Sequence, residues 1–259
     1  MGPGREGGVG YQFELSAAAL DILAEQLGFS ATRYPFEVRS VGITLDERAG
    51  IRDAVWRQLD SAGLVRGERL EPEVEQALRL YGQSPVEASL IGSGQDGLRL
   101  KARAGATRDG AVIAFGAGET VRFELLRPGD VAPALVRLMP AAPPGSGEAV
   151  TIPLDGAPRV DSAEERQTML ISGRPSAAQA SMRVARELFA RPRLRVGQFG
   201  VAMAGQPGQV LPWFDTEAGR YLAVRGQDST GREQVTYTPT DGTRLVRELA
   251  QRLSFTSTR

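Results

Sequence analysis

Two stretches of this sequence alternate apolar and polar residues with a period of two, and this pattern limits the fold more than any motif. The first covers residues 98–125 and contains three strand-like segments joined by turns with glycine. The second covers residues 193–238 and contains four such segments: Arg193–Met203, Val210–Phe214, Arg220–Arg225 and Gln234–Thr238. A period of two places successive side chains on opposite faces of a strand. Each stretch therefore predicts an antiparallel meander.

A helical pattern follows each meander. Pro128-Gly129-Asp130 precedes an apolar stripe that contains Leu135, and Pro239-Thr240-Asp241 precedes a stripe that contains Leu245. The spacing from the Pro-x-Asp sequence to the stripe differs by one residue between the two copies. The repeated order of meander and helix predicts an α+β fold that consists of two β-meander–helix halves with quasi-twofold symmetry.

The residues before the first meander predict a short strand and three helices. Residues 11–15 alternate as a strand would, and Ser16 is a favourable N-cap for the first helix. Thr44 and Glu47 have the spacing of a capping box, in which the two side chains satisfy each other's orphan amides. Pro72 is an allowed first-turn proline for the third helix.

Glycine and proline mark the expected boundaries along the chain. Residues 1–10 are rich in glycine, and we expect them to be disordered. Residues 140–147 have the composition of a linker. The expected divisions are an N-terminal subdomain at 11–139, a linker and helical segment at 140–192, and a C-terminal subdomain at 193–259. We expect the two halves to form one compact domain.

The sequence contains no histidine and no cysteine, which narrows the chemistry that it can perform. A Ser-His-Asp triad, a thiolate nucleophile and a zinc site with imidazole or sulfur ligands are all excluded. Lys101 is the only lysine, and it lies between Leu100 and Ala102, so a Walker A phosphate-binding loop is also excluded. An enzyme with this composition would have to work with carboxylates, hydroxyls, arginine or a bound hard cation. The favoured expectation is a protein that is not an enzyme and that needs no cofactor or metal.

The charge pattern argues against nucleic acid and membrane partners. The chain has 31 acidic and 31 basic residues, so no overall field attracts either one. The most basic segment, residues 183–195, lacks interleaved aromatic residues apart from Phe189. No apolar run reaches the roughly 18 residues of a membrane span, and no secretory leader is recognisable. We therefore expect a cytoplasmic protein.

Gly92, Gly94 and Gly97 have the G-x-G-x-x-G spacing of a dinucleotide-binding loop. In such a loop the last glycine leads into a helix whose N-terminal amides bind the pyrophosphate. Here Gly97 is followed by the strict alternation of residues 98–103, which has no helical face. The glycines are therefore interpreted as turn residues.

Asp215 and Glu217 support an alternative in which the protein is an enzyme. Two carboxylates this close could serve a carboxylate-based or metal-assisted hydrolase. The same segment is typical of a hairpin turn, in which Asp215 and Thr216 cap backbone amides and Gly219 takes a positive φ. The turn is the favoured interpretation, with the hydrolase as the alternative.

An apolar stripe on a helix predicted near residue 190 has two interpretations. Met182, Ala185 and Phe189 recur at helical spacing. The stripe either packs onto the sheet or offers a groove to a partner helix, a use that suits methionine and phenylalanine.

The apolar positions change parity within the strand predicted at Arg193–Met203. Leu194 and Val196 share one parity, whereas Phe199 and Val201 share the other. A change of face within one strand requires an extra residue, so we expect a bulge near Gly197-Gln198.

Several segments are familiar when taken together in order and spacing. They are Phe13-Glu14-Leu15-Ser16, Gly42-Ile43-Thr44-Leu45-Asp46-Glu47-Arg48-Ala49, Gly197-Gln198-Phe199-Gly200-Val201, Gly219-Arg220-Tyr221 and Pro239-x-Asp241. This set resembles the EspG family, the cytoplasmic chaperones of actinobacterial type VII (ESX) secretion systems. The resemblance covers roughly residues 11–255.

The resemblance implies a strongly twisted antiparallel sheet with quasi-twofold symmetry, flanked by helical bundles. It also implies that the chain binds the helical tip of the PPE subunit in a PE–PPE heterodimer, keeps this substrate soluble and directs it to its own secretion system. Such a chaperone needs no catalytic residue. In the family, the partner surface is one side of the sheet with the neighbouring C-terminal helices.

The family has no short binding motif that can be matched here, so the contact residues are chosen from local pattern. The expected partner-binding residues are Met182, Phe189, Phe199, Val201 and Met203. The sequence does not specify the PE–PPE pair or the secretion system, and it leaves a homodimer open.

Overall fold

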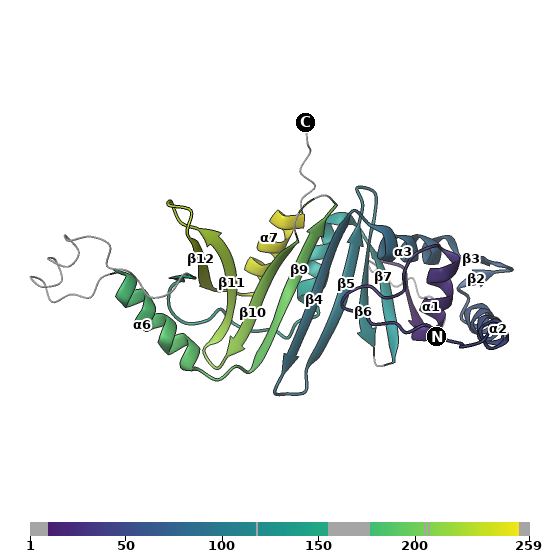
Figure 1. The fold of residues 1–259 in the computed structure, drawn as a ribbon, viewed down its shortest axis with the longest axis horizontal. Coiled ribbons are helices and arrows are strands. Elements are labelled where there is room, and N and C mark those ends of the chain that lie inside the picture. The colour runs from purple at the N-terminus through teal and green to yellow at the C-terminus, as the bar shows by residue number, and fades with distance from the viewer. Residues whose placement is uncertain (1–9, 118, 155–176, 205, 207, 254–259) are drawn as a thin grey trace, which may run out of the picture.

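The computed structural model describes residues 10–117, 119–154, 177–204, 206 and 208–253. Within these residues ten strands form one antiparallel sheet in the order β1-β7-β6-β5-β4-β9-β10-β11-β12-β8, which runs along the molecule in Figure 1. The strands of this sheet are β1 (Gln12–Ser16), β4 (Val86–Gly94), β5 (Arg99–Ala106), β6 (Ala111–Ala117), β7 (Thr120–Leu126), β8 (Val150–Pro153), β9 (Arg195–Met203), β10 (Gln209–Thr216), β11 (Gly219–Gln227) and β12 (Glu233–Pro239).

Helices and one small hairpin complete the described chain. The helices are α1 (Ala17–Gln26), α2 (Leu45–Ser61), α3 (Pro72–Gln83), the 3-10 turn η1 (Pro128–Asp130), α4 (Val131–Arg137), α6 (Ala177–Ala190) and α7 (Gly242–Leu253). The hairpin between α2 and α3 consists of β2 (Val65–Arg66) and β3 (Arg69–Leu70).

The sheet is arranged around a central antiparallel pair, β4 and β9. Val86 lies opposite Met203, and Gly94 lies opposite Arg195. From this pair, β4–β7 run outward in chain order to one side and β9–β12 to the other, and a helix follows each meander. An earlier strand completes each half, because β1 pairs with β7 and β8 pairs with β12. The predicted quasi-twofold α+β fold is confirmed, and each half contributes five strands, whereas the predicted meanders contain three and four.

One face of the sheet is covered by α4 and α7, which pack against each other. The core beneath them combines both halves of the chain. The first half contributes Leu90 and Ala102, the second contributes Phe199 and Trp213, and both helices add their apolar sides. The burial of this shared apolar surface holds the two halves together.

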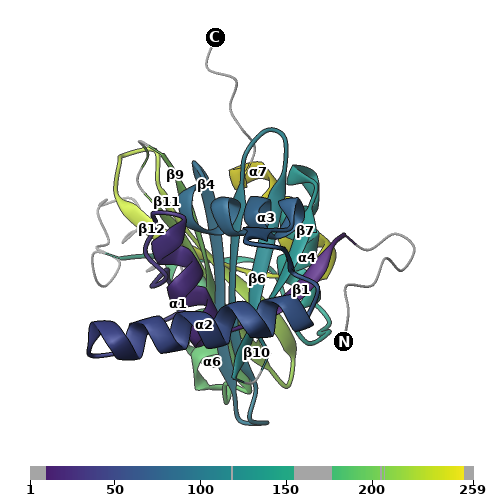
Figure 2. The same ribbon diagram turned by 90° about the vertical axis from the view of Figure 1, so that its right-hand side faces the viewer.

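Within the described residues, helices cover the opposite face towards its two ends. At the β7 end, α1, α2 and α3 enclose a core that contains Phe13, Tyr81 and Phe123, and Figure 2 shows these helices in front of the strands. At the β12 end, Leu188 of α6 packs with Phe214 and Tyr221. In Figure 1 the central strands β5, β4 and β9 lie between the two helical groups.

The local signals in the sequence set the helix starts as predicted. At α1, Ser16 Oγ accepts a hydrogen bond from the backbone N–H of Ala19 at 3.1 Å. The capping box of Thr44 and Glu47 is present at the start of α2. Pro72 occupies the first turn of α3, where its missing N–H leaves no hydrogen bond unmade.

The bulge expected near Gly197 is absent. β9 pairs in unbroken register with β4 on one side and with β10 on the other. Leu194 precedes the strand, and Val196 lies on the face opposite Phe199, where it is 43% exposed. The change of parity therefore reflects an exposed valine on a regular strand.

The prediction that the glycines at 92–97 form no nucleotide-binding loop is confirmed. The prediction that all of them are turn residues is wrong. Gly97 has a φ of +81° in the turn that leads into β5. Gly92 lies within β4, where a Cβ atom would come 2.8 Å from Cζ2 of Trp213. This position needs glycine because the indole ring occupies the space of a side chain.

Some expectations fall outside the described residues. They are the disordered start, of which only Gly10 is described, and residues 155–176 of the expected linker and helical segment. In the described ranges, no helix is both long and apolar enough to cross a bilayer.

Candidate partner-binding surface

The central strands present a face that no helix of the described chain covers. Cross-strand pairing arranges its side chains in rows, and one such row runs from Lys101 through Ile91 and Gln198 to Pro212. The neighbouring row passes through Val196. We call these exposed and half-buried positions the open sheet face: Ile91, Lys101, Val196, Gln198, Val210 and Pro212.

The centre of the open sheet face is apolar. Val210 is 50% exposed, Pro212 is exposed, and Ile91 is half-buried beside them. Gly200 lies directly opposite Val210 on β9 and adds no side chain above the strands. Exposed apolar residues that lie together indicate a surface for binding another molecule, whereas single exposed residues do not.

Tyr34 forms the edge of this surface on the side of the N-terminal helices. Tyr34 is 56% exposed. Gln198 on β9 donates a hydrogen bond from Nε2 to the Tyr34 hydroxyl at 3.3 Å, and Arg103 on β5 donates to the Tyr34 carbonyl at 3.3 Å. Arg103 also pairs with Glu87 of β4 and donates to the carbonyl of Tyr81. The loop is therefore hydrogen-bonded to β5 and β9 and presents an aromatic ring at Gln198.

An aromatic cluster forms the opposite edge, towards α6. The Arg193 guanidinium lies 3.9 Å from the ring centre of Phe214 and 5.4 Å from that of Phe189. Phe189 meets Tyr237 edge to face, with ring centres 5.0 Å apart. Burial lowers the pKa of Arg193 from its ordinary value, yet an arginine remains charged at neutral pH. This cation–π arrangement ties the end of α6 to the sheet.

The five residues selected from the sequence do not gather on one surface. Phe199 and Val201 lie in the core beneath α4 and α7, where Phe199 is fully buried. Met203 is half-buried and packs against the same core. A buried side chain cannot touch a partner, so Phe199 and Val201 are wrong as contact residues. Met182 is half-buried on α6, and Phe189 is exposed at the α6 edge described above.

Asp215 and Glu217, on which the hydrolase alternative rests, have different surroundings. Asp215 is 2% exposed, and its two carboxylate oxygens accept hydrogen bonds from Arg220 at 2.7 and 2.9 Å. Glu217 is exposed in the β10–β11 turn, where Gly219 has the expected positive φ of +110°. The expectation that Asp215 caps backbone amides is wrong, because the carboxylate pairs with a guanidinium. The buried ion pair of Asp215 and Arg220 therefore has a structural role.

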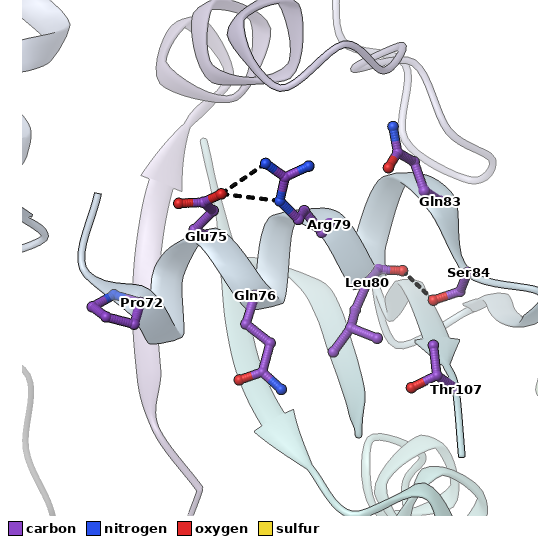
Figure 3. A pocket seen from close by; sticks show the side chains of 8 residues that line it. All are labelled: Pro72, Glu75, Gln76, Arg79, Leu80, Gln83, Ser84 and Thr107. Atoms are coloured by element: carbon purple, nitrogen blue, oxygen red, sulfur yellow. Dashed lines mark hydrogen bonds and ion pairs between the residues drawn. The ribbon is translucent and has the colours of Figure 1, made fainter. Parts of the chain in front are cut away.

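A hollow along α3 does not resemble an active site, because its charged groups are already paired with each other. This hollow has a volume of about 550 Å³ and is shown in Figure 3. Its charged groups, Glu75 and Arg79, pair with each other at 2.7 Å, and Ser84 Oγ donates to the Leu80 carbonyl. In the part of the chain that the structure describes, no group of three acidic side chains is placed to hold a metal ion. Polar groups that converge on a substrate position are thus missing from this hollow.

The sequence profile of the EspG family matches residues 16–251. The chain belongs to the EspG family. The EspG family is a family of secretion chaperones and not of enzymes. No curated protein sequence matches the chain. Among solved structures, the fold is similar to that of EspG5, a type VII secretion system chaperone of Mycobacterium tuberculosis solved in complex with a PE25–PPE41 dimer. The identity is 13%, the TM-score is 0.60, and the match covers 94% of this chain and 97% of that chain.

Sequence reasoning missed the residues that form the open sheet face in this EspG-family chain. Val196 and Val210 are apolar residues of a type that is usually buried in a core, and Tyr34 lies in a loop with no recognisable motif. The signal that could have found Val196 was its parity, because it faces away from Phe199 and Val201 on the same strand. A strand with apolar residues on both faces, only one of which is covered, is a candidate binding strand.

Proposed function

We propose that this EspG-family chain is a cytoplasmic chaperone that binds the helical tip of the PPE subunit in a PE–PPE heterodimer through the open sheet face. Binding would keep the secretion substrate soluble and direct it to its type VII secretion system. The observation that carries the proposal is the exposed apolar centre of the sheet in a member of a chaperone family. A complex with a PE–PPE dimer is known for EspG5, which shares this fold.

The dimensions of the open sheet face support a helical ligand. Neighbouring strands lie about 4.8 Å apart, so β4, β9 and β10 together span about the 10 Å diameter of an α-helix. Ile91, Gln198 and Pro212 form one row across these three strands. Tyr34 and the Phe189 cluster border the row on its two sides. An apolar helix end placed here would bury the exposed valines, and such burial favours association.

The proposal is tested by co-expression with the PE–PPE-type pair encoded nearest to the gene. We expect a stable complex with one copy of each chain in size exclusion with light scattering. Val196→Asp and Val210→Asp should each weaken binding by at least about tenfold, because a carboxylate would be desolvated in the interface. Leu45→Asp is the matched control, since Leu45 is exposed at the start of α2, outside the open sheet face.

The outcomes separate the surface from the function. Loss of binding in the valine variants, with binding retained in Leu45→Asp, supports both the open sheet face as the binding surface and the proposed chaperone function. Wild-type binding that neither valine variant weakens contradicts the open sheet face as the binding surface. A wild-type chain that forms no complex with the pair at micromolar concentration contradicts the proposed partner.

A further inference from the structure

Lys101 differs from every other basic residue in this chain. It is the only lysine among 31 basic residues, and it is exposed on β5 at the margin of the open sheet face. Its side chain makes no hydrogen bond or ion pair to any described residue. It lies opposite Ile91, one strand away from the apolar centre of the surface.

Among the described residues of β5, β4, β9 and β10 that share this face with Lys101, basic side chains outnumber acidic ones. On this face of β5, β4, β9 and β10, the one carboxylate is that of Glu87. Glu87 is already paired with the buried guanidinium of Arg103. Arg99, two residues before Lys101 on the same strand, is also exposed, and its one side-chain hydrogen bond goes to a backbone carbonyl. The margin formed by Lys101 and Arg99 is therefore a cationic border beside an apolar centre.

We infer that Lys101 selects partners whose apolar helical tip carries a carboxylate about one helical turn from the residues that cover Ile91. This inference rests on the proposed function and adds the chemistry that the tip must present. The spacing is suitable, because one helical turn rises about 5.4 Å and adjacent strands lie about 4.8 Å apart. A lysine suits this position, since its ammonium group sits on a flexible stem and can follow a carboxylate on a curved tip.

An ion pair at such a margin governs which partner binds and how fast. Complementary charges at the rim of an interface raise the association rate and discriminate against partners with like charge. Partial covering by the docked helix removes solvent from the pair, so a reversed charge at Lys101 is costly. The contribution of the pair is also expected to fall as salt screens it.

The test measures affinity for the purified PE–PPE-type pair at low and at high salt. Lys101→Glu should weaken binding by at least about tenfold at low salt, whereas Lys101→Arg should stay within about threefold of wild type. Arg57→Glu is the matched control, because Arg57 is exposed on α2 away from the sheet face. Since Lys101 is exposed, circular dichroism should show that all three variants are folded.

A second readout needs no mutation. Because Lys101 is the only lysine, acetylation by an amine-reactive ester followed by peptide mass spectrometry reports on this one ε-amine. In the complex, its acetylation should be at least about tenfold slower than in the chain alone, as expected for an amine covered and paired with a carboxylate.

The inference and the proposed function fail in different ways. Equal affinity of Lys101→Glu and wild type, or unchanged acetylation in the complex, overturns the role of Lys101 while the complex itself still stands. Equal losses in Lys101→Glu and Arg57→Glu overturn it as well, because the effect then follows net charge. Failure of the wild-type chain to bind the pair overturns both.

Discussion

Arg220 forms a buried ion pair with Asp215, and its guanidinium also has hydrogen-bond and aromatic partners in the interior. Besides its two hydrogen bonds to Asp215, Arg220 donates from Nη2 to the Pro140 carbonyl at 2.9 Å and lies over the ring of Trp213. Its backbone N–H donates to the carbonyl of Pro143. The pair thus fixes the β10–β11 hairpin to the segment that leaves the first half. Removal of one partner would leave a buried charge uncompensated.

The first prediction separates Asp215 from Glu217. Asp215→Ala should lower the free energy of unfolding by about 3–5 kcal/mol, whereas Glu217→Ala, in an exposed turn, should change it by less than about 0.5 kcal/mol. Urea unfolding followed by circular dichroism measures both. Folded preparations of either variant should still bind the PE–PPE pair. Loss of binding in folded Glu217→Ala would give this turn a function that the structure does not assign to it.

Tyr81 provides a second prediction at this scale, in alkaline solution. Burial raises the pKa of Tyr81 to about 12, while its hydroxyl donates to the carbonyl of Ala31 at 3.3 Å. An unfolded tyrosine has a pKa of about 10. Because the folded pKa is the higher one, its stabilising contribution is complete below about pH 10 and is lost as the pH rises towards 12. A shift of this size corresponds to about 2–3 kcal/mol.

The measurement compares wild type with Tyr81→Phe. Urea unfolding at about pH 8 and about pH 11 should show a larger loss of stability for wild type than for the variant. The difference isolates Tyr81, because the other four tyrosines are present in both proteins. Parallel losses in the two proteins would show that Tyr81 ionises as easily when folded as when unfolded.

Among the strands, the contact of β4, β9 and β10 depends on two glycines that face one indole ring. Gly92 and Gly197 lie directly opposite each other on β4 and β9. A Cβ atom would lie 2.8 Å from the Trp213 ring at Gly92 and 2.5 Å from it at Gly197. Trp213 is almost fully buried at this place, between the strands and the shared core. The ring covers the glycines, as an aromatic side chain on a neighbouring strand often does.

Gly92→Ala should therefore destabilise the fold by about 1–3 kcal/mol, because the added methyl group displaces a packed indole ring. Gly226→Ala is the control in β11, since a Cβ atom there meets nothing within 4 Å. It should be neutral or slightly stabilising, because alanine reduces the freedom of the unfolded chain. Thermal unfolding and tryptophan fluorescence of both variants provide the comparison. Equal stability of the two variants would contradict the assigned packing.

Most helices and strands could be predicted from the sequence, whereas the face of the sheet that the helices cover could not. Period-two alternation and glycine turns located β9–β12, and capping residues such as Thr44 located the helices, because these signals act over a few residues. The pairings of β1 with β7 and of β4 with β9 join segments about 100 residues apart, and no local pattern encodes them. The open sheet face is set by which side α4 and α7 cover. Phe199 and Val196 are both apolar, and only the packed helices show that one is core and the other is surface.

At the scale of the whole molecule, the two halves share one core. Leu90 of the first half and Phe199 of the second are directly opposite each other in the central strand pair. Both are fully buried, together with the contact between α4 and α7. If either half unfolded alone, it would expose this apolar surface and the edge of a nine-residue strand. Such coupling predicts that the two subdomains unfold as one cooperative unit.

The two tryptophans allow this to be tested, because each half contains one. Trp56 lies half-buried on α2, and Trp213 is buried in the shared core. Trp213→Phe leaves only Trp56 to report on the first half, and Trp56→Phe leaves only Trp213 to report on the second. In each variant the urea midpoint from fluorescence should equal that from circular dichroism. A Trp56 signal that is lost before the bulk of the structure would show that α1–α3 unfold separately from the sheet. In that case Tyr34 would leave the open sheet face while the strands stay folded. Partner affinity would then fall at a lower urea concentration than the one that unfolds the shared core.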